Sequence, residues 1–399
     1  MRRRNQIALA ASVTWVLYLC GSFCIAYVLS LGPSTFCGLA GSVLYEKGRY
    51  REAERIMLRA DKTLMPSRLY DFPRSLALSR LGRTQLKLGK YAEAENTYRR
   101  LLAIVDGKPG KEGWRAAHAL MGLAQACRYQ GKLAEAESLY LRAVSARQRI
   151  HGTDSTWAAG ALQGLGVTYL HERKLDQADH VLGQAVAIFE KRKPNSESLS
   201  VALEDLSDCR IQQKKYKEAE ELCKRSLTIE QDVKASSLDV AISNHRLALI
   251  YTAEKRYAEA TSLYKQALAA EEKAYGSESD KVARLLAELG RNLIKQKKYE
   301  EAEVPLRQAA GIYRKRSPDS AELWRTLYDL SVDCYLQNDY AGAADALRGT
   351  LDVKGEFKIN PRYNIMILEG LVKCSENLGK SSDAEKYRKQ LSALRQSKK

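Results

Sequence analysis

Proline is scarce in this 399-residue chain, which contains only 8, and its 25 glycines are also few. An all-β fold with frequent turns needs both residues, so their scarcity argues against such a fold. The 8 cysteines are too few for a disulfide scaffold of this length. Hydrophobic residues make up 45% of the chain and charged residues 28%, which excludes a disordered or collagen-like chain and favours a long helical protein.

Charge is missing from a long stretch near the N-terminus. After the arginines at positions 2–4, no Asp, Glu, Lys or Arg appears before Glu46, and residues 7–31 are almost wholly apolar. A helix over this segment would be about 37 Å long, which is enough to cross a bilayer. We therefore predict a basic cytoplasmic start over residues 1–6 and a transmembrane signal anchor over residues 7–31.

Two other interpretations of this segment stay open. A cleaved signal peptide would share the basic start and could be cut after Ala40, although its apolar core is usually 7 to 15 residues long. A buried helix of a soluble protein would be shorter and flanked by charge. Because positively charged flanks of a transmembrane helix stay in the cytoplasm, we expect a single-pass protein with a cytoplasmic N-terminus. The rest of the chain after the helix would lie on the non-cytoplasmic side. Signal cleavage would instead give a secreted or periplasmic protein.

A phrase of the type GKYAEAE recurs nine times along the chain. Its alanine sets a register with successive spacings of 41, 42, 42, 41, 41, 42, 41 and 41 residues, at Ala53, Ala94, Ala136, Ala178, Ala219, Ala260, Ala302, Ala343 and Ala384. Another small residue stands twelve positions earlier in eight copies, at Gly41, Gly82, Ala124, Gly166, Ser207, Ala248, Gly290 and Ser331. Small residues on both sides of a turn let two helices approach closely, so each copy predicts a helical hairpin.

The repeated phrases resemble the tetratricopeptide repeat family, as in LAEAESLYLRAVSARQRIHG (133–152) and YAEATSLYKQALAAEEKAYG (257–276). The long period resembles the kinesin-light-chain subtype, and the resemblance covers residues 34–399. It implies an all-α, right-handed superhelical solenoid of about nine helix-turn-helix repeats, with a concave groove lined mainly by the first helix of each repeat. Kinesin light chains hold cargo with a pair of asparagines, which is absent here, for example at Ser79-Arg80. The resemblance therefore carries the fold and not the cargo role.

No pattern of catalytic or metal-binding residues stands out. The 5 histidines show no metal-ligand spacing with one another or with cysteine, and no C-x-x-C occurs. The glycine-rich residues 107–111 lack the spacing of a phosphate-binding loop. Five cysteines fall at apolar repeat positions, where a thiol packs as a small hydrophobe: Cys127, Cys209, Cys223, Cys334 and Cys374. We expect no enzyme activity, no cofactor, no metal and no small-molecule substrate.

Polar residues of the first helices should point into the groove by the family register. In the second and third repeats these candidate peptide-binding residues are Arg80, Arg83, Lys87, His118, Gln125, Arg128 and Tyr129. Basic side chains on rigid helices suit a peptide with an acidic segment or a C-terminal carboxylate. The alternative is that they are ordinary solvated residues of an exposed helix face.

The predicted function is a membrane-anchored scaffold that binds protein or peptide partners through its groove. The net charge of +17 leaves one alternative, an electrostatic binder of polyanions such as nucleic acid or an anionic lipid surface. Charges alternate in sign along the repeats, as in residues 215–225, which is typical of a solvated face. Nucleic acid is therefore the less favoured partner.

Overall fold

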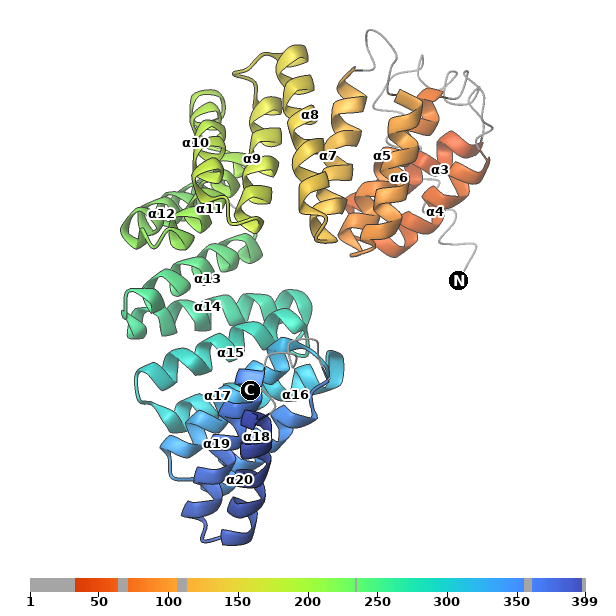
Figure 1. Cartoon of the computed structure of the whole chain (residues 1–399). Coiled ribbons are helices and arrows are strands. Elements are labelled where there is room, and N and C mark those ends of the chain that lie inside the picture. The colour runs from red at the N-terminus through yellow and green to blue at the C-terminus, as the bar shows by residue number, and fades with distance from the viewer. Residues whose placement is uncertain (1–32, 64–70, 106–112, 234, 355–360, 397–399) are drawn as a thin grey trace. The chain divides into compact units, whose positions relative to one another are not determined.

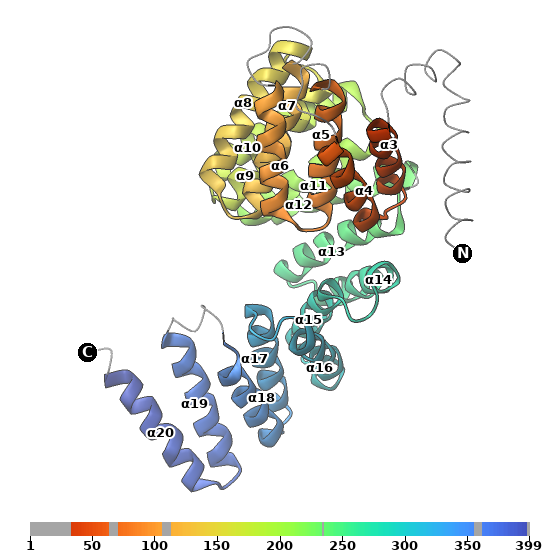
Figure 2. The same ribbon diagram turned by 90° about the vertical axis from the view of Figure 1, so that its right-hand side faces the viewer.

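The computed structural model describes residues 33–63, 71–105, 113–233, 235–354 and 361–396. These residues form 18 helices, and consecutive helices pair side by side as hairpins (Figures 1 and 2). The chain divides into two compact units, residues 1–194 and 195–399. Within each unit the hairpins stack in chain order, which makes each unit an all-helical solenoid.

The described helices of the first unit form four hairpins. They are α3 (Pro33–Glu46) with α4 (Tyr50–Thr63), α5 (Asp71–Lys87) with α6 (Tyr91–Val105), α7 (Gly113–Tyr129) with α8 (Leu133–His151), and α9 (Thr156–His171) with α10 (Leu175–Arg192).

The described helices of the second unit form five hairpins. They are α11 (Glu197–Gln212) with α12 (Tyr216–Asp232), α13 (Ser237–Ala253) with α14 (Tyr257–Tyr275), α15 (Asp280–Lys295) with α16 (Tyr299–Arg316), α17 (Ala321–Leu336) with α18 (Tyr340–Asp352), and α19 (Pro361–Asn377) with α20 (Ser381–Gln396).

Each hairpin turns through one residue with a positive φ, five positions before the register alanine. After α5 this residue is Gly89, and the amide of Lys90 then donates to the carbonyl of Gln85 at 2.9 Å, which ends the helix. Glycine fills the position in four hairpins, at Gly48, Gly89, Gly131 and Gly379. In the other five it is a residue with a Cβ: Arg173, Lys214, Lys255, Lys297 and Asn338.

The small residues bring the two helices of a hairpin into close contact, as predicted. All nine register alanines are buried, with exposed fractions of 0% or 1%. A Cβ on Gly290 would lie 2.5 Å from Cγ of Leu306, so only glycine fits there without a shift. Ser207 meets its own register alanine directly, because its hydroxyl donates to the carbonyl of Ala219 at 3.1 Å.

The structure does not support the transmembrane helix that the sequence predicts. Among the described residues, no helix is both long and apolar enough to cross a bilayer. The longest, α8 and α14 at 19 residues each, each carry five Asp, Glu, Lys or Arg residues. Residues 7–31, over which the sequence predicts the signal anchor, lie outside the described residues. The finding contradicts the expected transmembrane helix and the single-pass localisation.

Candidate functional site

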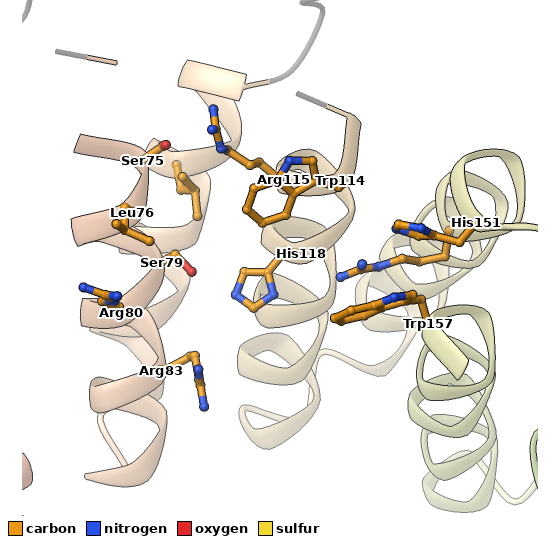
Figure 3. Close-up of a pocket in the computed structure, with 12 residues that line it drawn as sticks. Ser75, Leu76, Ser79, Arg80, Arg83, Trp114, Arg115, His118, His151 and Trp157 are labelled. Atoms are coloured by element: carbon orange, nitrogen blue, oxygen red, sulfur yellow. The ribbon is translucent and has the colours of Figure 1, made fainter. Parts of the chain in front are cut away.

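A cavity of about 580 Å³ opens in the first unit between α5, α7, α8 and α9 (Figure 3). Its size lies within the range of pockets that hold small ligands or peptide side chains. Four of its lining residues are arginines, and none of those that the structure describes is Asp or Glu. The lining residues are Ser75, Leu76, Ser79, Arg80, Arg83, Leu101, Trp114, Arg115, His118, Arg147, His151 and Trp157.

Helix α5 contributes a basic wall to the cavity. Arg80 and Arg83 stand about one turn apart on this helix, and both line the cavity. The guanidinium carbon of Arg83 lies 5.0 Å from the centroid of the Tyr45 ring, at the neighbouring helix α3. Burial and the charge of Arg83 lower the pKa of Arg80, against the opposing effect of Glu46. The two arginines therefore make this wall of the cavity positively charged.

Helix α7 places a neutral histidine opposite that wall. Figure 3 shows the His118 ring directed into the space between α5 and α7. Burial, and then the positive charges of Arg147 and Arg83, lower the pKa of His118 to about 4. At neutral pH its imidazole is uncharged, so it offers one donor and one acceptor without adding positive charge.

Arg147, near the end of α8, is the most unusual residue of the cavity. It is only 3% exposed, and its Nε has no hydrogen-bond partner among the described residues. Its guanidinium carbon lies 4.9 Å from the centroid of the Trp157 ring. Burial lowers its pKa. A buried cation without an anionic partner is unfavourable, and a bound anion would remove that penalty.

Two tryptophans supply the apolar part of the cavity. Trp114 on α7 is 44% exposed and Trp157 on α9 is 57% exposed, and both line the cavity with His118 (Figure 3). His151 stacks on Trp157 with ring centroids 5.7 Å apart, which supports the indole from one side. Exposed tryptophans beside arginines are typical of surfaces that bind other proteins.

The structure brings three of the seven predicted site residues together. Arg80, Arg83 and His118 line the cavity, and the other four do not. Lys87 is exposed in the last turn of α5, and Gln125 is half-buried in α7. Arg128 and Tyr129 end α7 in a separate cluster, where the Tyr129 ring stacks on Tyr91 with centroids 4.7 Å apart and Arg128 lies over it.

Five residues that line the cavity were not predicted from the sequence: Arg147, Trp114, Arg115, His151 and Trp157. Arg147 has equivalents at the same position of other repeats. That residue stands eleven positions after the register alanine Ala136. The same place holds buried apolar or aromatic residues in the second, fourth and seventh repeats: Val105, Phe189 and Tyr313. In the fifth and sixth repeats it holds the buried glutamates Glu230 and Glu271, so Arg147 differs from the other buried copies in carrying a positive charge.

One group of residues has the proximity of a metal site. Ligand atoms of Glu95, Cys127 and Glu135 lie within 4.8 Å of one another. The carboxylates already have cationic partners, because Lys132 Nζ lies 2.7 Å from Glu95 and Arg99 Nη2 lies 2.7 Å from Glu135. Burial raises the pKa of Cys127 to about 11, which disfavours the thiolate that a metal needs. The group is best explained as an ion-pair network between repeats.

Family models decide the classification of the chain. A model described as tetratricopeptide repeat matches residues 115–191 and 239–315, and a second of the same description matches residues 39–109 and 79–149. The chain belongs to the tetratricopeptide repeat family. The resemblance predicted from the repeated phrases is thereby confirmed. None of the curated proteins matches this tetratricopeptide repeat chain significantly.

Several solved structures are similar to this chain. The apo form of RapI is 15% identical with a TM-score of 0.59, and the match covers 91% of this chain and 97% of RapI. A Rap protein complexed with competence and sporulation factor is 13% identical with a TM-score of 0.57, covering 92% and 99%. Repeats of a putative kinesin light chain from Podospora anserina are 23% identical with a TM-score of 0.45, covering 52% and 98%. At these identities the likeness concerns the fold alone.

Proposed function

We propose that this chain is a non-enzymatic protein-interaction scaffold whose first unit binds an acidic peptide segment of a partner protein. The binding site is the cavity between α5, α7, α8 and α9. Membership of the tetratricopeptide repeat family supports the scaffold role, because stacked repeats present extended binding surfaces. A Rap protein of similar fold is known in complex with competence and sporulation factor.

The observation that supports an acidic ligand is the buried positive charge of Arg147 in a cavity without acidic lining residues among those described. Arg147 is buried with an unpartnered Nε, and Arg80 and Arg83 line the same space. No described lining residue is acidic. A carboxylate would accept charge-assisted hydrogen bonds from these guanidinium groups, and such bonds are about twice as strong as neutral ones.

The surplus of positive charge does not by itself favour a polyanion. Many basic residues pair with an acidic residue of the preceding repeat, 36 or 37 positions earlier. Lys132 pairs with Glu95 at 2.7 Å, and Lys174 pairs with Glu137 at 2.7 Å. These pairs neutralise charge between successive repeats. In the cavity, in contrast, the buried Arg147 keeps an Nε without a hydrogen-bond partner among the described residues.

Fluorescence anisotropy with labelled ten-residue peptides tests the proposal. The peptides carry no, two or four acidic residues in an otherwise identical sequence. We expect saturable binding that strengthens with the number of carboxylates and that weakens at least tenfold in Arg83→Glu. The matched control is Arg149→Glu, an exposed position on α8 that does not line the cavity, and it should bind as the unmodified chain does.

Salt separates the two kinds of binding. Polyanion binding through diffuse charge falls steeply between about 50 and 200 mM salt, and both variants would weaken it equally. Binding in the cavity depends on Arg83 far more than on Arg149 at either salt concentration. Absence of saturable binding by every acidic peptide would contradict the proposal.

A further inference from the structure

The cavity carries more positive charge than one carboxylate would neutralise. Of its four arginines, Arg147 and Arg83 have aromatic rings as neighbours, at 4.9 and 5.0 Å, and no carboxylate partner among the described residues. A phosphate monoester carries a charge of about −1.5 to −2 at pH 7 and has three acceptor oxygens. It therefore matches several guanidinium groups better than the single charge of a carboxylate does.

The position of Arg147 sets the shape of the ligand. Arg147 is buried, and the exposed indole of Trp157 lies over its guanidinium group. A ligand that reaches Arg147 must therefore pass along an indole, with Leu76 and Leu101 also lining the way. A flat apolar stem makes favourable contact with such walls, whereas the short aliphatic stem of Asp or Glu has no ring to stack.

His118 completes the set of donors. Because it is neutral at pH 7, one ring nitrogen carries a proton that can be donated to an anionic oxygen. Its neutrality is partly a result of the charges of Arg147 and Arg83. An anion bound between those arginines would cancel their effect, so binding should raise the pKa of His118. This gives a signature that simple surface binding would not produce.

We propose that the cavity binds a phosphate monoester on an aromatic side chain, that is, a phosphotyrosine segment of a partner protein. The aromatic ring lies against Trp157 and Trp114, and the phosphate oxygens accept hydrogen bonds from Arg147, Arg83 and His118. The inference rests on the proposed function, because it names the ligand of the same cavity.

The test uses the full chain with Trp15→Phe and Trp324→Phe, which leaves Trp114 and Trp157 as the only tryptophans. Phenyl phosphate, phenylacetate and inorganic phosphate are titrated at pH 7.5 while tryptophan fluorescence is followed. We expect phenyl phosphate to bind at least tenfold more tightly than either other compound. Three labelled peptides differ only at one position, which holds tyrosine, phosphotyrosine or glutamate. The phosphotyrosine peptide should bind at least tenfold more tightly than the other two.

Three variants locate the site. Arg147→Met should weaken phenyl phosphate binding at least tenfold, and Arg83→Met, at an exposed position, should do so without altering a buried residue. Arg149→Met is the matched control on α8 and should bind normally. In a proton NMR titration, phenyl phosphate should raise the pKa of His118 by at least one unit.

Each outcome is decisive for the proposal. Equal affinities for phenyl phosphate and phenylacetate would contradict the preference for a phosphate over a carboxylate. Inorganic phosphate binding as tightly as phenyl phosphate would contradict the contribution of the aromatic ring. Binding of phenyl phosphate but not of the phosphotyrosine peptide would overturn the protein source. If acidic peptides bind but phenyl phosphate neither binds nor competes with them, this inference is wrong and the proposed function is still supported. Failure of both would contradict the two together.

Discussion

The guanidinium group of Arg147 lies over the ring of Trp157, with 4.9 Å between its central carbon and the ring centroid. An aromatic face attracts a cation, but more weakly than a carboxylate does. Since Arg147 is buried with an unpartnered Nε, the ligand-free protein holds a charge that its surroundings do not fully compensate. The arrangement lowers the stability of the free protein and favours the binding of an anion.

Replacing this charge should stabilise the free protein while it impairs binding. We expect Arg147→Met to raise the free energy of unfolding by ~1–3 kcal/mol, because an uncompensated buried charge gives way to an apolar side chain of similar length. Thermal unfolding of the full chain measures the effect. Arg149→Met, at an exposed position on the same helix, should change little. A lower melting temperature for Arg147→Met would show that the charge is well compensated.

Two glycines of α9 should respond to alanine with opposite signs. A Cβ on Gly164 would lie 2.3 Å from Cε1 of Tyr140, whereas one on Gly160 would meet nothing within 4 Å. We expect Gly164→Ala to destabilise the protein by ~1–3 kcal/mol through overpacking. Gly160→Ala should stabilise it by ~1 kcal/mol, the difference in helix propensity. Urea unfolding monitors both, and stabilisation by both would contradict the close helix approach.

The turn between α13 and α14 should be improved by glycine. Lys255 has a φ of 64°, a region that costs a residue with a Cβ ~1–2 kcal/mol. We expect Lys255→Gly to stabilise the second unit by ~1 kcal/mol. Lys255→Ala keeps the Cβ and removes the charge, so it serves as the control and should not stabilise. Equal gains in the two variants would assign the effect to charge instead of backbone strain.

The repeat period predicts most of the fold because its determinants are local. The register alanines and their small partners locate each hairpin. The turn residue with a positive φ always stands five positions before the alanine, even where it is Lys255 and not glycine. The membrane segment was the main error, since no described helix can span a bilayer. An apolar run of sufficient length is compatible with a transmembrane helix, but the run alone does not establish that such a helix forms.

The candidate site was only partly predictable because it combines successive repeats. Arg80, Arg83 and His118 lie on first helices, where the register indicates a groove. Arg147 comes from a second helix and Trp157 from the next repeat, so their meeting depends on how the repeats stack. On α7, only residues of the first turns line the cavity, so Gln125, Arg128 and Tyr129 lie beyond it. The sequence predicted these three from the repeat register alone.

A single hydroxyl joins two buried carboxyl groups in the second unit. Ser243 Oγ is hydrogen-bonded to Glu204 Oε1 and lies 2.9 Å from Glu230 Oε1. A hydroxyl has one proton to donate, so Ser243 cannot donate a full hydrogen bond to both carboxyl groups at once. Burial raises the pKa of Glu204 to about 7, against the opposing charge of Arg246. The carboxyl group of Glu204 therefore gains and loses its proton near neutral pH.

That proton should make the second unit more stable in mild acid. The pKa of Glu204 is raised above its ordinary 4.5, so its contribution is fully present below that value and is lost as the pH rises through about 7. Between pH 5 and pH 8 the free energy of unfolding should fall by about 2 kcal/mol from this group. Urea unfolding across this range should show that Glu204→Gln removes the fall, whereas Glu197→Gln, exposed on the same helix, keeps it. A fall that persists unchanged in Glu204→Gln would place the titrating proton on another group.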